Sequence, residues 1–294
     1  MASAEQASGV PAGRPGTTQD TTAPPHAQGQ RPPDRVSGGD QGSEGVAARV
    51  RAALAALDAA QKPGAGVPAY TRWVNRRGAR LVAAVGAVAG WTPTMVTAAS
   101  AVLSAAGMCL LLLLPPATWS GLPVAVALAA GYLLDSADGQ LARLTGTSSR
   151  TGEWVDHVVD AFRSPAIHLT TAVAVLVHRP DSPWLAGVAL VYAWVTSGQF
   201  LSQILAEAFV RRAGRPQTRG GDLRSWVLAP TDPGVLCWSF VLWGLPSAFS
   251  LTYTLLAVVA VLHSAASLRR RHRDLRALDA AQAGAGRAGG GTGA

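Results

Sequence analysis

Apolar residues gather in the middle and later parts of the chain, in runs long enough to cross a bilayer. A helix needs about 20 mostly apolar residues to cross ~30 Å of hydrocarbon. The pattern predicts six such spans, at residues 93–114, 121–144, 154–177, 183–210, 233–245 and 248–268. The fifth run is short for a full span, so it either begins earlier, near Trp226, or is broken at Pro233. The predicted fold class is therefore all-α, a polytopic membrane protein.

Two amphipathic segments precede the first span, within residues 45–92. One of them, at residues 70–90, mixes arginines with Trp73 and a short apolar stretch. This mixture is typical of an amphipathic helix that lies in the membrane interface. In the other segment apolar residues recur at helical spacing, at Val46, Val50, Leu54 and Leu57. This pattern predicts a second surface helix, or a helix for self-association or for a partner.

The two ends of the chain are predicted to be flexible. Residues 1–44 are rich in Pro, Gly, Ser, Thr and Gln and hold almost no large apolar side chain. Such a segment buries too little surface to offset its chain entropy, so we expect it to be disordered. It also lacks the apolar core of a secretory signal peptide. The six-helix domain is expected at residues 93–270, followed by a flexible cytoplasmic tail at 271–294.

Composition and charge support the membrane interpretation. Charged residues make up 14% of the chain, whereas soluble domains carry about 25%. The net charge of +8 is a property of many nucleic-acid-binding proteins, but here the arginines cluster at the ends of apolar runs. Arginines precede the first span, occur in the connections between spans two and three and between spans four and five, and follow the sixth span. The remaining connections hold a single basic residue, Arg179. This asymmetry predicts that both termini and the even-numbered connections lie in the cytoplasm. It also accounts for the positive net charge without a nucleic-acid partner.

Four aspartates flank the connection between the second and third spans. Asp135 and Asp138 share one helix face, and Asp156 and Asp160 share another. An antiparallel helix pair with a short connection brings these faces together near the cytoplasmic surface. Two like charges ~4 Å apart repel by ~4 kcal/mol at an effective dielectric near 20. A divalent cation relieves this repulsion, and oxygen ligands favour Mg²⁺, Mn²⁺ or Ca²⁺ over zinc.

The residues between the aspartates are suited to a phosphate ligand. Gly139 and Ala142 leave room on the helix face. Arg143 ends the second span, where a guanidinium pairs with phosphate oxygens. Ser149 lies in the connection within reach of a nucleotide, and Gly152 opens the third helix close to the carboxylates.

This spacing, D-x2-D-G-x2-A-R-x8-G-x3-D-x3-D from Asp135 to Asp160, resembles the signature of the CDP-alcohol phosphatidyltransferase family at every defined position. The resemblance extends to the six-span layout and to the WTPTMVT stretch before the first span, where Thr94 stands in place of a frequent Asn. It covers roughly residues 70–270.

The resemblance implies a reaction in phospholipid biosynthesis. A CDP-linked lipid, usually CDP-diacylglycerol, gives its phosphatidyl group to a polar alcohol or its phosphate, and CMP leaves. The resemblance also implies a cofactor of two Mg²⁺ or Mn²⁺ ions and a homodimer. Its implied metal ligands are Asp135, Asp138, Asp156 and Asp160, with Asp160 also the catalytic general base. The implied CDP-binding residues are Gly139, Ala142, Arg143, Ser149 and Gly152.

The acceptor pocket is less sharply marked. Arg211 and Arg212 end the fourth span and suit a phosphorylated acceptor, or they serve as topogenic charge. Gln199 and Gln203 belong to a polar run inside that span, which faces either an acceptor pocket or a neighbouring helix.

Other classes of protein also place acidic residues in membranes. An intramembrane prenyltransferase binds a diphosphate through Mg²⁺, but through two separated Asp-rich motifs. A cation transporter places its carboxylates nearer the bilayer midplane, often on broken helices. The third alternative is a membrane scaffold that has kept the motif without activity.

Overall fold

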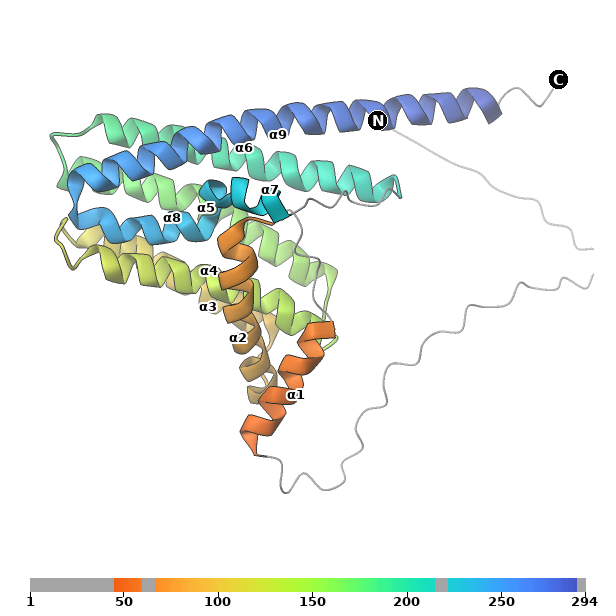
Figure 1. Ribbon diagram of the computed structural model, residues 1–294, viewed down its shortest axis with the longest axis horizontal. Helices are drawn as coiled ribbons and strands as arrows, with labels where there is room; N and C mark the ends of the chain where they lie inside the picture. The colour runs from red at the N-terminus through yellow and green to blue at the C-terminus, as the bar shows by residue number, and fades with distance from the viewer. Residues whose placement is uncertain (1–44, 60–66, 215–221, 290–294) are drawn as a thin grey trace, which may run out of the picture. The chain divides into compact units, whose positions relative to one another are not determined.

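The computed structural model describes residues 45–59, 67–214 and 222–289, and all regular secondary structure in these ranges is helical (Figure 1). The predicted all-α class is therefore confirmed. The long helices are α1 (Val46–Ala59), α2 (Arg76–Ala89), α3 (Pro93–Leu113), α4 (Gly121–Leu144), α5 (Arg150–His178), α6 (Trp184–Arg212) and α9 (Pro246–Gly289). The short helices are η1 (Thr71–Asn75), α7 (Asp222–Val227), η2 (Ala229–Thr231), α8 (Pro233–Ser239) and η3 (Phe240–Gly244). The predicted disorder of residues 1–44 concerns a segment outside the described residues.

Local sequence signals define where the helices around α4 begin and end. α2 ends at Gly90, whose φ of 74° lies in the left-handed region that glycine adopts without strain. α3 begins with Thr92 as N-cap, whose Oγ1 accepts a hydrogen bond from Met95 N at 3.2 Å, and with Pro93 in its first turn. Together these residues turn the chain sharply from α2 into α3.

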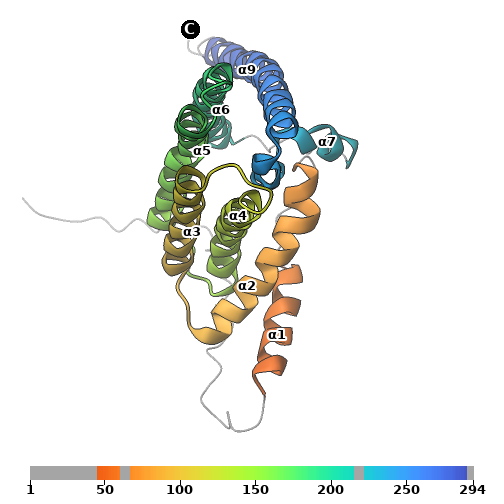
Figure 2. The ribbon, with the colours of Figure 1, turned by 90° about the vertical axis from the view of Figure 1, so that its left-hand side faces the viewer.

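α4 lies between α3 on one side and α2 on the other (Figure 2). Small residues let α3 and α4 approach closely, because a Cβ on Gly107 would lie 2.8 Å from Leu128 Cγ. Ser100 Oγ also donates a hydrogen bond to Gly131 O at 2.8 Å, fully inside the protein. This tight contact fixes the helix that carries the first two aspartates of the motif.

An aromatic cluster fills the core where η3 meets α9. The ring centroids of Trp243 and Phe249 are 5.2 Å apart and nearly perpendicular, and those of Phe249 and Tyr253 are 5.4 Å apart. Phe240 lies 5.6 Å from Phe249. All four side chains are fully buried, so this cluster holds the short α8–η3 segment against the last long helix.

The N-terminal helices pack on the protein itself. Leu57 of α1 is 1% exposed and shares a core cluster with Ala83 of α2 and Leu141 of α4. Arg80 of α2 forms an ion pair with Asp58 of α1. α1 therefore has an intramolecular partner in α2, although Val46 at its start is exposed. The location of these helices in the membrane interface stays a prediction.

Three of the described helices are long and apolar enough to cross a membrane: α3, α6 and residues Pro246–Ala281 of α9. No more than 33% of the apolar window of each is buried inside the protein, so most of this apolar surface faces outward. The fifth predicted span has a different form, because α8 has 7 residues and η3 has 5. At 1.5 Å per α-helical residue this segment is well short of the ~30 Å of hydrocarbon.

The last helix is longer than the sequence pattern indicated. We expected a flexible tail from residue 271, whereas α9 continues to Gly289. The sequence RHRDLRALDAAQ after the apolar part is rich in Arg, Leu and Ala, which have high helix propensity, and this explains the extension.

A buried aspartate joins the segment before α2 to the segment before α8. Asp232 is 1% exposed and caps α8, accepting a hydrogen bond from Gly234 N at 2.9 Å. Its carboxylate also accepts hydrogen bonds from Thr71 N at 2.7 Å and from Thr71 Oγ1 at 2.8 Å. Thr71 Oγ1 in turn lies 2.7 Å from the hydroxyl of Tyr132 in α4. One carboxylate thus links η1, α4 and α8.

Replacing this carboxylate should destabilise the fold. We expect Asp232→Ala to lower the free energy of unfolding by about 1–3 kcal/mol, because a helix cap is lost and buried donors are left unpaired. Thermal unfolding of the purified protein in detergent measures the change. Asp181→Ala, in the exposed turn before α6, is the control and should leave the melting temperature unchanged. Equal melting temperatures for the two variants would contradict the assigned link.

Candidate active site

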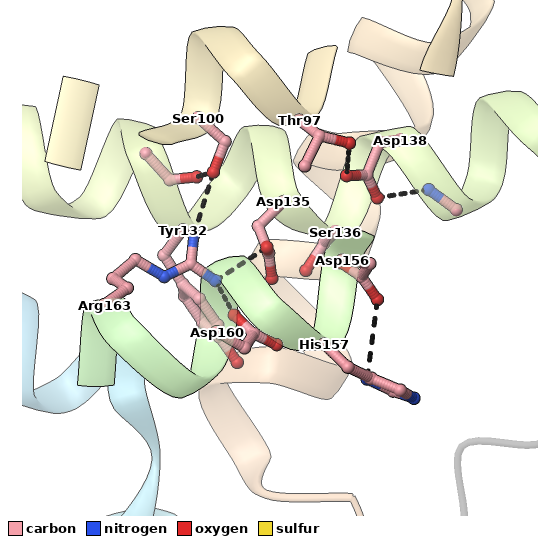
Figure 3. Close-up of polar contacts among 12 residues, drawn as sticks. Thr97, Ser100, Tyr132, Asp135, Ser136, Asp138, Asp156, His157, Asp160 and Arg163 are labelled. Carbon is pink, nitrogen blue, oxygen red and sulfur yellow. Dashed lines mark hydrogen bonds and ion pairs between the residues drawn. The ribbon is translucent and has the colours of Figure 1, made fainter. Parts of the chain in front are cut away.

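Three carboxylates from two helices converge at the end of α4 and the start of α5 (Figure 3). Asp135 comes from α4, and Asp156 and Asp160 come from α5. One oxygen from each lies within 4.8 Å of the others, and all three residues are partly buried. The spacing of the motif therefore translates into a compact group of oxygen atoms.

Asp138 is oriented differently, toward α3. It is 5% exposed, and its Oδ2 accepts a hydrogen bond from Thr97 Oγ1 at 2.5 Å. Its Oδ1 accepts one from Gly139 N at 2.5 Å. Both oxygens thus have donors in the protein, and Asp138 is not part of the three-carboxylate group. Its role as a metal ligand stays a prediction.

Arg163 is a site residue that the sequence analysis missed. Its Nη2 lies 2.6 Å from Oδ1 of Asp135, and the same nitrogen forms an ion pair with Asp160. Its Nη1 donates a hydrogen bond to Ser100 Oγ at 2.8 Å. The signal was present in the sequence, because Arg163 is a basic residue inside a predicted span, one helical turn after Asp160.

The oxygen donors fit a hard divalent cation. Asp135, Asp156 and Asp160 would hold it, since carboxylate oxygens are preferred ligands of Mg²⁺ and Mn²⁺. Asp135 Oδ1 is buried and already lies 2.6 Å from Arg163 Nη2, so a metal ion bound here would share this carboxylate with Arg163.

His157 lies at the rim of this group. Its Nδ1 is 4.0 Å from Asp156 Oδ2, and its Nε2 is 3.8 Å from Glu153 Oε1. The ring also has an edge contact with Phe200 of α6, at 6.3 Å between centroids. These contacts indicate that His157 helps to pack the start of α5 on α6.

Arg143 of α4 lies near Asp138, and Arg76 at the start of α2 lies near Arg143. The Arg143 side chain covers Gly139, because a Cβ at that position would lie 3.4 Å from Arg143 Nη1. Arg143 Nε is buried and has no hydrogen-bond partner within the described ranges. Gln140 Nε2 donates to Arg76 O at 3.1 Å, which brings the start of α2 against this part of α4. Burial lowers the pKa of the Arg76 guanidinium from its ordinary value, and the nearby Arg72 lowers it further.

The other predicted CDP-binding residues support the start of α5. Ser149 is the N-cap of α5, and its Oγ accepts a hydrogen bond from Gly152 N at 3.0 Å. Gly152 is exposed, and Ala142 is half-buried on α4. Their contacts with a nucleotide stay predictions.

The structure separates the predicted acceptor residues into two groups. Gln199 bonds to α9, with Ser264 Oγ and Ser267 Oγ each at 3.2 Å, while Gln203 is exposed. Arg211 donates to Glu153 Oε1 at 3.0 Å and so reaches the first turn of α5. The neighbouring Arg212 is exposed. Arg211 thus contacts the helix that carries Asp156 and Asp160.

Comparison with known families agrees with this geometry. The model of the CDP-alcohol phosphatidyltransferase family matches residues 91–266, which is more than half of the 294-residue chain. The chain therefore belongs to this family, and it is a membrane transferase of the CDP-alcohol phosphotransferase type that acts in phospholipid synthesis. Members use CDP-alcohol substrates and an alcohol acceptor and generally depend on a divalent metal. A comparison with curated proteins gave no match.

Metal binding at the three carboxylates can be tested through stability. We expect Mg²⁺ to raise the melting temperature of the protein, because a ligand at about 100 times its Kd stabilises the fold by about 2.7 kcal/mol. Asp156→Asn should abolish most of this shift, since it removes one ligand. Glu153→Gln, on the same helix but outside the group, is the matched control and should keep the shift. An undiminished Mg²⁺ shift in Asp156→Asn would contradict the assignment.

Proposed function

We propose that this protein transfers a phosphatidyl group from CDP-diacylglycerol to a polar alcohol, with release of CMP. The observation that carries the proposal is the convergence of Asp135, Asp156 and Asp160 in a chain that belongs to the family. The acceptor oxygen attacks the phosphorus that bears the diacylglycerol. The bond from this phosphorus to the CMP oxygen breaks, and the hydroxyl proton of the acceptor moves to Asp160.

In this proposal the CDP head group is bound by metal ions, by Arg143 and by a pocket lined with small residues. Bound Mg²⁺ or Mn²⁺, two ions in our proposal, neutralises the diphosphate and lowers the barrier to its cleavage. Asp135, Asp138, Asp156 and Asp160 are the proposed ligands. The Arg143 guanidinium, whose Nε has no hydrogen-bond partner within the described ranges, pairs with a phosphate oxygen. The proposed CDP pocket also includes Gly139, Ala142, Ser149 and Gly152.

Asp160 is the proposed base, as the family resemblance implies. Its side chain is 28% exposed, compared with 35% for Asp156 and 12% for Asp135, so exposure separates Asp160 from Asp135 but not from Asp156. An acceptor hydroxyl from the aqueous phase therefore reaches Asp160 more easily than Asp135. A positioned carboxylate of this kind contributes to catalysis by accepting the proton as the new phosphate ester bond forms.

We also propose that the chain crosses the cell membrane six times, with both termini and the active site on the cytoplasmic side. The fifth crossing would then begin ahead of α8, near Trp226, because α8 and η3 alone are too short. The basic connections support this orientation, and α4 and α5 have 24 and 29 residues, which is long enough to span. The acyl chains of the donor then stay in the lipid while the CDP head group reaches the carboxylates. The family resemblance supports a homodimer.

The acceptor is proposed to be a small alcohol or its phosphate. Arg211 supports the phosphorylated class, because its contact with Glu153 places a cation at the start of α5. Gln199 is engaged between α6 and α9, which favours a role in helix packing over acceptor binding.

The reaction is tested by CMP release. Purified protein with CDP-diacylglycerol and Mg²⁺ should release CMP only when the correct alcohol is added, so each candidate alcohol and its phosphate is supplied in turn. The labelled lipid product identifies the acceptor. A folded protein that binds Mg²⁺ but releases no CMP with any acceptor would overturn the proposal and favour a scaffold.

The assignment of the base predicts a specific kinetic defect. We expect Asp160→Asn to lower kcat by about 10²–10⁴-fold, the range typical of a general base. The KM for CDP-diacylglycerol should change less than kcat, because Arg143 and the three remaining proposed metal ligands still bind the donor. Asp181→Asn, in the exposed turn before α6, should keep full activity. A native kcat in Asp160→Asn would show that another group accepts the proton.

A further inference from the structure

Arg163 is a buried cation among the carboxylates. Its side chain is 10% exposed, and its Nη2 is shared by Oδ1 of Asp135 and Oδ1 of Asp160 (Figure 3). These two aspartates come from different helices, so a single nitrogen ties α4 to α5. The distance from Nη2 to Asp135 Oδ1 is 2.6 Å.

The other side of the guanidinium is anchored in the helix core. Arg163 Nη1 donates to Ser100 Oγ at 2.8 Å, and Ser100 Oγ donates to Gly131 O at 2.8 Å. Ser100 is fully buried in the contact between α3 and α4. The guanidinium is therefore held on two sides, by the carboxylates and by the contact between α3 and α4.

Arg163 and a metal ion would compete for the same carboxylates. Asp135 and Asp160 are two of the three residues that offer oxygens to a metal ion, and each already offers one oxygen to Arg163. Without a cation these partly buried carboxylates would repel one another, and with Arg163 present part of their charge is neutralised. A metal ion entering the group meets both the remaining negative charge and the positive charge of the guanidinium.

We propose that Arg163 is a resident counter-cation of the metal site. It stabilises the carboxylate group before metal binds, and it lowers the affinity for divalent ions so that they exchange. Arg163 is thus a positioning residue that acts through Asp135 and Asp160. This inference rests on the metal site of the proposed function.

The proposal predicts two opposite shifts in one variant. Arg163→Gln removes the charge and leaves buried carboxylates unpaired, so the metal-free protein should melt at a lower temperature. The same variant should bind Mn²⁺ more tightly, with a Kd reduced at least about fivefold, because a nearby unit charge affects a divalent ion strongly even at an effective dielectric near 20. A residue with a purely structural role would lower stability without tightening metal binding.

The experiment uses the full-length protein in detergent. Free Mn²⁺ is measured by electron paramagnetic resonance during titration, and thermal unfolding is recorded in EDTA. Arg163→Lys keeps the charge and should keep the wild-type Kd for Mn²⁺ within about threefold, although an ammonium cannot reproduce the planar fork. Arg179→Gln is the matched control, because Arg179 donates to Pro246 O and Ser250 Oγ at the opposite end of α5.

Each outcome distinguishes the inference from the proposed function. Absence of Mn²⁺ binding by the wild-type protein would overturn the metal site and the inference with it. Wild-type binding together with an unchanged or weaker affinity in Arg163→Gln would overturn the inference alone. If Arg163→Gln does not fold, Arg163→Lys decides, since weakened Mn²⁺ binding in that variant would show that geometry and not charge is what Arg163 contributes.

Discussion

The repulsion between carboxylates gathered at the junction of α4 and α5 is the constraint on which the site depends. Asp135, Asp156 and Asp160 place oxygens within 4.8 Å of one another in a partly buried setting. Such a group is unstable without cations or donors around it. Arg163 meets part of this requirement, because it pairs with two of the three carboxylates. The negative charge that remains is what a divalent cation would neutralise in the proposed reaction.

The close contact between α3 and α4 helps to hold Arg163 beside the carboxylates. The Ser100 hydroxyl has two roles. It joins α3 to α4 through Gly131 O, and it accepts a hydrogen bond from Arg163. The packing of the helices and the electrostatics of the site therefore depend on the same side chain. These two hydrogen bonds explain why a polar residue is fully buried in the contact between α3 and α4.

The helical fold and the convergence of three of the four aspartates could be predicted because both follow from local spacing. The same pattern placed Asp138 in the group, whereas its carboxylate binds Thr97 of α3 instead. The aspartates three and four residues apart lie on shared helix faces, and a short connection brings the two faces together. Arg163 also had a local signal, since it lies three residues after Asp160 inside a predicted span, but the link from Asp232 to Thr71 could not be found in this way. Asp232 and Thr71 are 161 residues apart, and their contact depends on how α8 packs against η1. The extension of α9 was missed for another reason: hydropathy marks the end of an apolar run, whereas helix propensity decides where the helix ends.

The Asp232–Thr71 contact shows that the folded unit extends beyond the region matched by the family model. The family match begins at residue 91, after η1 and α2. Yet Thr71 supplies two of the donors to the carboxylate that starts α8, and Leu57 and Ala83 complete a core with Leu141, two residues before Arg143. A shortened chain that kept only the matched region would expose this face of α4 and remove the Thr71 donors from the buried Asp232 carboxylate. Residues ahead of the family region are thus an integral part of the catalytic scaffold, and sequence divergence there can alter the enzyme without touching its motif.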